Sequence, residues 1–180
     1  MPSQKPVTDK LRTNSFSMLI VVVGLIAAAA YGTVVLTTRD WVWFLNGFDP
    51  LPRRVVVYDK GVRTEYLPGQ NGYIELAEAA RASLASGAVR PSGIGLSAGS
   101  LQDAYGMYLS VEVFFAEPVK LHAWFNTDGP NQMLFLMTGR HSDQPIVFLG
   151  LNNQYMANGP ILKTVEPIRA ALKTLGYTFD

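Results

Sequence analysis

The chain has 180 residues, with 15 basic and 14 acidic side chains and no cysteine. This near-neutral balance provides no field that would recruit nucleic acid. The lack of cysteine excludes disulfides, thiolate metal sites and a cysteine nucleophile. The length suits one membrane-spanning segment followed by a single domain of about 140 residues.

Residues 17–38, "SMLIVVVGLIAAAAYGTVVLTT", predict a transmembrane helix. No charged residue occurs between Met18 and Leu36. A helix of that length, at about 1.5 Å per residue, nearly matches the roughly 30 Å hydrocarbon core of a bilayer. A buried helix of a small soluble domain would carry a polar face at 3.6-residue spacing, and this stretch has none.

A cleaved signal peptide is the alternative to a permanent anchor. Basic residues precede the apolar run, and residues 27–30 offer a cleavage site of the A-x-A type. The apolar run nevertheless continues to Leu36, and Trp41, Trp43 and Phe44 follow it. These aromatic residue types settle at the membrane–water interface. We therefore favour a permanent anchor with these three residues as interfacial anchors, and keep secretion after cleavage near Ala30 as the alternative.

The basic residues flanking the apolar stretch predict its orientation. Lys5, Lys10 and Arg12 precede it, whereas only Arg39 closely follows it. The positive-inside bias therefore places the N-terminus in the cytoplasm, in a cell membrane crossed once. This divides the chain into a short cytoplasmic tail (1–16), a transmembrane helix (17–38), an interfacial segment and linker (39–52) and an extracytoplasmic domain (53–180).

Three small residues recur every fourth position within the apolar stretch: Gly24, Ala28 and Gly32. They share one face of a helix, where a second helix could approach closely. The expected partners are therefore the lipid bilayer and, through this face, a membrane protein or a second copy of the chain. The alternative is that glycine and alanine are simply common in such helices.

The first part of the domain predicts a β-hairpin and a helix. Residues 55–58 and 62–67 read as two strands joined by a turn at Asp59-Lys60-Gly61. Residues 73–87 then switch to helical spacing, with Asn71 or Gly72 at the start and Gly87 at the end. The glycines of residues 87–100 are interpreted as turn residues, because their spacing does not fit a phosphate-binding loop.

Residues 108–125 predict a second hairpin with a three-residue loop at Ala116-Glu117-Pro118. In that register the apolar residues of both strands share one face, with Phe115 opposite Val119. On the other face Glu112 would lie opposite His122, as a cross-strand pair. A metal site at His122 is not expected, because the chain has only one other histidine.

The remaining segments complete the predicted α+β domain. Residues 133–137 are apolar on both faces, which indicates an interior strand, and residues 145–151 form the next strand. Residues 164–176 form the closing helix, with Thr164 as its cap. The expected fold is a single N-terminal transmembrane helix followed by one domain with a mostly antiparallel sheet and two main helices.

No catalytic, cofactor-binding or metal site emerges from the sequence. Arg140-His141-Ser142-Asp143 contains the residue types of a hydrolase triad, but adjacent side chains cannot converge as a triad requires, and Ser142 lacks the Gly-x-Ser-x-Gly motif. The chain shows no phosphate-binding loop or cofactor motif. We therefore expect no cofactor, and nothing favours an enzyme.

Binding remains the best hypothesis. Phe114, Trp124, Arg140 and His141 are candidates for a recognition surface, because a sheet covered on one face would leave aromatic residues exposed on the other. A helix covering that second face would instead place Phe114 and Trp124 in the core. The sequence therefore predicts a membrane-anchored extracytoplasmic binding, accessory or scaffolding protein. An extracytoplasmic small-molecule sensor or hydrolase, with a cleft between loops 87–100 and 140–145, is the alternative.

Overall fold

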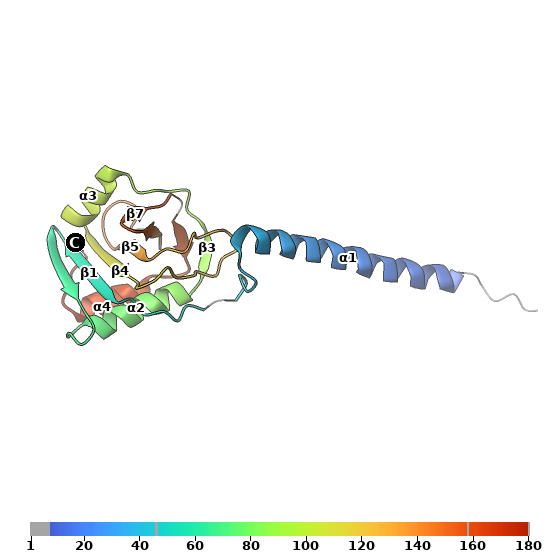
Figure 1. Cartoon of the computed structure of the whole chain (residues 1–180), viewed down its shortest axis with the longest axis horizontal. Helices are drawn as coiled ribbons and strands as arrows, with labels where there is room; N and C mark the ends of the chain where they lie inside the picture. Colours follow the sequence, from blue (N-terminus) through green and yellow to red (C-terminus); the bar gives the residue numbers. More distant parts are fainter. Residues whose placement is uncertain (1–7, 46, 158, 180) are drawn as a thin grey trace, which may run out of the picture.

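The computed structural model describes residues 8–45, 47–157 and 159–179, with side chains from Ser15 onward. The chain forms one long helix and an α+β domain (Figure 1). Its elements follow in this order: α1 (Thr8–Thr38), β1 (Arg54–Asp59), β2 (Val62–Tyr66), α2 (Tyr73–Ala85), β3 (Ala88–Pro91), α3 (Ala98–Gly106), β4 (Leu109–Phe114), β5 (Gln132–Leu136), β6 (Val147–Leu151), β7 (Gln154–Tyr155), β8 (Pro160–Leu162) and α4 (Glu166–Thr174).

Six strands form an antiparallel sheet in the order β2-β1-β4-β5-β6-β7. The predicted hairpin of β1 and β2 is confirmed, with Asp59 paired to Val62 across the turn. The central strands β4 and β5 are buried on both faces over almost their whole length. Because such strands expose apolar side chains on both sides, each face of this sheet must be covered by another layer.

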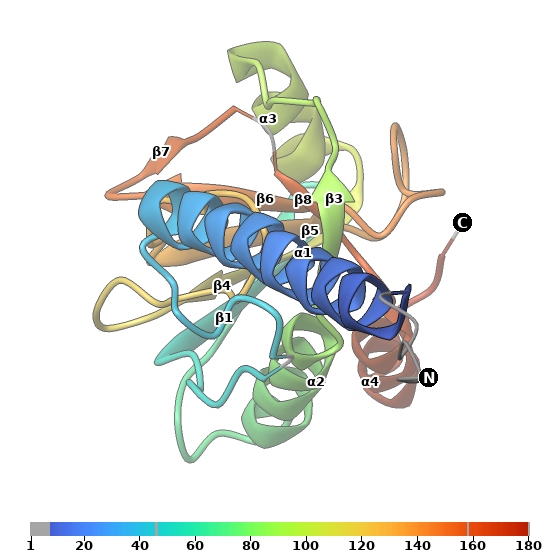
Figure 2. The ribbon, with the colours of Figure 1, turned by 90° about the vertical axis from the view of Figure 1, so that its right-hand side faces the viewer.

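Helices α2 and α4 cover one face of the sheet (Figure 2). The predicted helix at residues 73–87 is confirmed, and it buries Leu76, Ala80 and Leu84. Ile168 and Leu172 of α4 join the same core. The N-cap residue of α4 is Val165 and not Thr164 as predicted, and the Thr164 hydroxyl, one residue earlier, accepts a hydrogen bond from the Glu166 backbone N–H at 3.1 Å.

Helix α3 covers part of the opposite face, which the sequence left open between a cover and an exposed patch (Figure 1). Ala104 is fully buried against Leu134 and Phe148 of the sheet. The helix is capped by Ser97, whose hydroxyl accepts from the Ser100 backbone N–H at 3.1 Å. The short sheet of β3 and β8 adjoins this layer through an isolated bridge between Ile161 of β8 and Ile146, which directly precedes β6.

Helix α1 projects away from the domain (Figure 1). Its segment Ser15–Thr38 is the one helical stretch in the described chain that is long and apolar enough to cross a membrane. Its apolar side chains from Phe16 to Ile26 are exposed. The helix starts at Thr8, so residues 8–16, assigned from the sequence to the tail, are helical, and residues 1–7 lie outside the described part.

The predicted hairpin at residues 108–125 is wrong. Strand β4 pairs with β1 on one side and with β5 on the other, with Glu112 opposite Val56 and Leu134. Both edges of β4 are therefore occupied, and residues 119–125 form no strand. They run as a loop in which Leu121 and Ala123 are buried, so the alternation of apolar residues arises from packing on the core and not from strand pairing.

Replacing Phe135 with alanine is expected to destabilise the domain by about 3–5 kcal/mol, because this fully buried ring fills the core between β5 and the α2/α4 layer. Chemical denaturation of the full chain in detergent, followed by circular dichroism, measures the loss. The matched control is Val62→Ala, at a side chain that is 66% exposed. Equal effects of the two substitutions would contradict the assigned core.

Candidate functional site

The chain reverses direction where α1 ends. Arg39 adopts a left-handed conformation (φ 53°), and the Asp40 backbone N–H donates to the Thr38 hydroxyl at 3.2 Å. The turn at residues 41–45 then folds back along the helix. The Tyr31 hydroxyl donates to the Trp41 carbonyl at 2.6 Å, and the rings of Tyr31 and Phe44 are 6.5 Å apart. The last two turns of α1 therefore form part of a folded junction with the domain.

A buried carboxylate joins this junction to the domain. Asp40 is only 2% exposed, although it lies next to the end of an exposed helix. Its Oδ2 lies 2.7 Å from Nδ1 of His122, and its Oδ1 accepts from the Val42 backbone N–H at 3.0 Å. The Lys120 ammonium lies 3.6 Å from Oδ1 and donates to the Arg39 carbonyl at 2.7 Å. Loop 118–129 therefore binds the end of α1 through the side chains of Lys120 and His122.

These partners lower the pKa of the Asp40 carboxyl below its usual value. Burial alone would raise this pKa, but the hydrogen bonds from His122 and from the Val42 backbone, together with the charges of His122 and Lys120, outweigh the loss of solvation. The carboxylate form of Asp40 is therefore the form that the junction stabilises.

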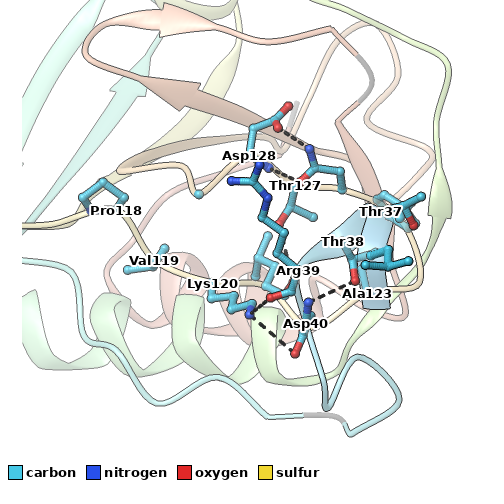
Figure 3. A pocket seen from close by; sticks show the side chains of 15 residues that line it. Thr37, Thr38, Arg39, Asp40, Pro118, Val119, Lys120, Ala123, Thr127 and Asp128 are labelled. Carbon is cyan, nitrogen blue, oxygen red and sulfur yellow. Dashed lines mark hydrogen bonds and ion pairs between the residues drawn. The ribbon is translucent and has the colours of Figure 1, made fainter. Parts of the chain in front are cut away.

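A cavity of about 620 Å³ lies between the last turn of α1 and loop 118–129, and we call it the junction cavity (Figure 3). Arg39 and Lys120 supply cations to its lining, and Asp40 and Asp128 supply carboxylates. Asp40 is occupied by the contacts just described. The Arg39 guanidinium has no hydrogen bond or ion pair with any residue that the structure describes. The cavity therefore offers a free cation beside the end of an apolar helix.

The predicted pair of Glu112 and His122 is wrong, because His122 binds Asp40 and Glu112 lies in a different cluster. Glu112 is 1% exposed on the α3 face of the sheet. Its carboxylate accepts hydrogen bonds from four side chains, namely Tyr58 (2.9 Å), Tyr105 (2.9 Å), Tyr155 and Gln132. We call these five residues the tyrosine cage.

The tyrosine cage provides the Glu112 carboxylate with four hydrogen-bond donors, so we assign this cluster a structural role. Burial, followed by the charge of Glu112 and its hydrogen bond, raises the pKa of Tyr58 to about 12, although nearby Arg63 partly opposes this change. Burial and the charge of Glu112 also raise the pKa values of Tyr105 and Tyr155. Neutral hydroxyls that donate to a buried carboxylate are the arrangement that low-dielectric surroundings require.

A second, smaller cavity lies between α3, strands β5 and β6 and loop 139–145, and we call it the distal cleft. Its volume is about 170 Å³, and it joins the two loops between which the alternative sensor or hydrolase hypothesis located a cleft. Asp103, Tyr108, Arg140 and His141 line it, and none of these four side chains forms a hydrogen bond or ion pair within the described part of the chain. Leu96, Leu136 and Phe148 form an apolar wall.

The four residues predicted to form a recognition surface lie in three different places. Arg140 and His141 share the distal cleft. Phe114 is half-buried at the end of β4 beneath the Arg54 guanidinium, 3.8 Å from the ring centre. Trp124 is 50% exposed on the loop beside the junction cavity, where its Nε1 donates to the Val89 carbonyl at 3.1 Å.

Ser142 and Asp143 do not build a hydrolytic site. The Ser142 hydroxyl donates to the Gly139 carbonyl at 2.8 Å, which ties it into the turn, and Asp143 is exposed and is not among the residues that line the distal cleft. Among the described residues no group of three or more histidine, aspartate or glutamate side chains is placed to hold a metal ion.

The residues assigned to the membrane lie on α1 and in the turn that follows it. Trp41 and Phe44 are exposed, and Trp43 is partly buried with its ring 5.8 Å from Phe44. On α1, Gly24 and Ala28 are exposed and Gly32 is partly exposed. A side chain added at Gly24 or Gly32 would meet no atom within 4 Å.

The role of Asp40 was not predicted, because its partner His122 lies 82 residues further along the chain. The only local signal is an acidic residue placed directly between an apolar helix and a tryptophan-rich turn. Neither a known protein family, nor a curated protein, nor a solved structure matches this chain.

The tyrosine cage predicts loss of stability in alkali. An unfolded tyrosine ionises near pH 10, whereas Tyr58 in the folded protein holds its proton to about pH 12. The stabilisation is therefore complete below pH 10 and is lost as the pH rises through 12. Tyrosinate absorbance at 295 nm and circular dichroism, recorded together, should show a late ionisation step that coincides with unfolding. Tyr155→Phe should shrink that step, and a late step of unchanged size in this variant would contradict the cage.

Proposed function

We propose that this protein is a membrane-anchored extracytoplasmic binding protein with an accessory or scaffolding role. Helix α1 is a permanent anchor, the N-terminus lies in the cytoplasm, and the domain lies outside. The anchor contacts the bilayer through Trp41, Trp43 and Phe44, and Gly24, Ala28 and Gly32 provide the face on which a second helix packs.

The observation that supports a permanent anchor best is the junction at Asp40. A cleaved signal peptide has no reason to be built into its domain, yet α1 continues without a break through residues 27–30. Tyr31 donates to the Trp41 carbonyl and Val35 is 7% exposed. Buried charge and apolar packing at this point hold the domain in a fixed position relative to the helix, which is the property of an anchored binding domain.

Cysteine labelling tests the anchor and its orientation, because the chain has no native cysteine. Val62→Cys, at an exposed position in the β2 strand, should react with a membrane-impermeant maleimide in intact cells. The matched variant Ser3→Cys should react only after the membrane is permeabilised. The labelled protein should remain in the membrane fraction at full length. Release of a product that starts near Tyr31, or the reverse labelling pattern, would overturn the proposal.

The distal cleft favours small-molecule sensing as a second candidate function. Arg140 and Asp103 bring opposite charges to one small cavity with an apolar wall, and His141 and Tyr108 add groups that donate or accept hydrogen bonds. Polar side chains without protein partners around a cavity are suited to a ligand that carries its own charged groups. A small amphoteric molecule matches this lining.

Thermal denaturation of the purified full chain against amino acids, short dicarboxylates and phosphate tests the distal cleft. At least one amphoteric compound should raise the unfolding temperature, and Arg140→Ala should weaken its binding about tenfold or more, the loss typical of a charged hydrogen bond. Arg53→Ala, which removes an exposed arginine outside the cleft, is the control. If no compound changes the unfolding temperature, or if both variants respond as the wild type does, the cleft is not a ligand site.

A further inference from the structure

We propose that the junction cavity holds the headgroup of a zwitterionic bilayer phospholipid, with its phosphate at Arg39 and its ammonium group at Asp128. This inference rests on the proposed function, because it requires α1 to stay in the bilayer. It assigns a ligand to the cavity of about 620 Å³ between the end of α1 and loop 118–129.

The position of the junction cavity relative to the bilayer follows from the turn at residues 41–45. This turn folds back to the level of Tyr31, and Trp41, Phe44 and Leu45 in it are exposed. Exposed tryptophan and phenylalanine beside a membrane helix mark the boundary between hydrocarbon and headgroups. The lining of the cavity begins at Leu36, about 7.5 Å beyond Tyr31 along the helix, and a headgroup layer is roughly 5–7 Å thick. The cavity therefore opens at the outer part of the headgroup layer.

The face of the domain from which α1 projects carries further apolar side chains. Figure 2 views the molecule from the side on which α1 projects, and strand β3 lies on this face. Val89 of β3 is 48% exposed, and Trp124 beside it is 50% exposed. The adjacent residues Ala123 and Phe125 line the junction cavity. Trp124 thus extends the aromatic belt of the anchor to the other side of the cavity, so this face rests on the lipid surface.

The charges in the cavity match a zwitterion. Lys120 and His122 compensate Asp40, as described above. This leaves the Arg39 guanidinium, which is exposed and without a partner in the described chain, and the exposed carboxylate of Asp128, which accepts only from the neutral amide of Asn126. Figure 3 shows the Arg39 side chain extending from the helix end toward the segment of Thr127 and Asp128. A free cation and a free anion favour a ligand with one phosphate and one ammonium group over a purely anionic lipid.

Native mass spectrometry of the full chain released from nanodiscs tests this inference. From equimolar phosphatidylethanolamine and phosphatidylglycerol, the wild type should retain one phosphatidylethanolamine molecule in preference. Arg39→Gln should lower its occupancy about tenfold or more, and Asp128→Asn should abolish the preference between the two lipids. Arg53→Gln, outside the cavity, should change neither. Equal retention of both lipids by the wild type, or displacement by soluble glycerophosphoethanolamine at equal concentration, would overturn the lipid assignment.

Fluorescence provides a second readout that does not depend on those variants. With Trp41→Phe and Trp43→Phe combined, Trp124 is the only tryptophan. In nanodiscs it should be quenched more by a lipid with a quencher near its headgroup than by one with a quencher deep in its acyl chain. Full quenching by aqueous iodide with no lipid quenching would overturn the inference. Failure here leaves the labelling pattern of Val62→Cys unchanged, so it is distinguishable from failure of the anchor.

Discussion

Asp40 carries a charge that the fold removes almost entirely from water, and the position of the domain on α1 depends on how that charge is satisfied. An ionised carboxylate left without partners in such a place would cost several kcal/mol. His122 and Lys120 satisfy it from loop 118–129, so the loop must lie against the end of the helix. Leu121, between these two residues, is buried in the main core, so the same segment that binds Asp40 is itself fixed to the sheet. The junction is therefore a continuation of the domain core.

The sheet is subject to a second constraint, because its central strands are apolar on both faces. Helices α2 and α4 cover one face with an almost purely apolar core, whereas α3 is too short to cover the other face fully. Glu112 lies where the apolar cover ends, and the hydroxyls of Tyr58, Tyr105 and Tyr155 close over it. The rings of Tyr58 and Tyr105 are 4.3 Å apart, so they add apolar contact as well as hydrogen bonds. A charged residue in a central strand is thus tolerated because aromatic side chains extend the α3 layer.

Local features of the fold could be predicted from the sequence and non-local ones could not. The β1–β2 hairpin and α2 are encoded by turn residues and periodicity within about 15 residues, and both are correctly predicted. The pairing of β4 with β1 joins residues 50 to 60 positions apart, and no local pattern distinguishes it from a hairpin with residues 119–125. The contact between Asp40 and His122 could not be predicted for the same reason, because these residues are 82 positions apart. A cleft between loops 87–100 and 140–145 belonged only to the alternative hypothesis, and the contribution of Asp103 and Tyr108 to it required coordinates.

A fixed junction changes what an anchor can do. A flexible linker would let the domain rotate freely above the membrane, whereas here Phe48, only two residues beyond the undescribed position 46, is already buried against Phe115. Because α1 is one continuous helix from Thr8 to Thr38, its tilt and rotation are transmitted directly to the domain. Packing of a second helix on the face of Gly24 and Ala28 would therefore set the direction in which the distal cleft points. Under the proposed anchoring, lipid contacts at the junction and helix contacts within the bilayer would both act through the contacts of Asp40 with His122 and Lys120, and so would both influence the orientation of the distal cleft.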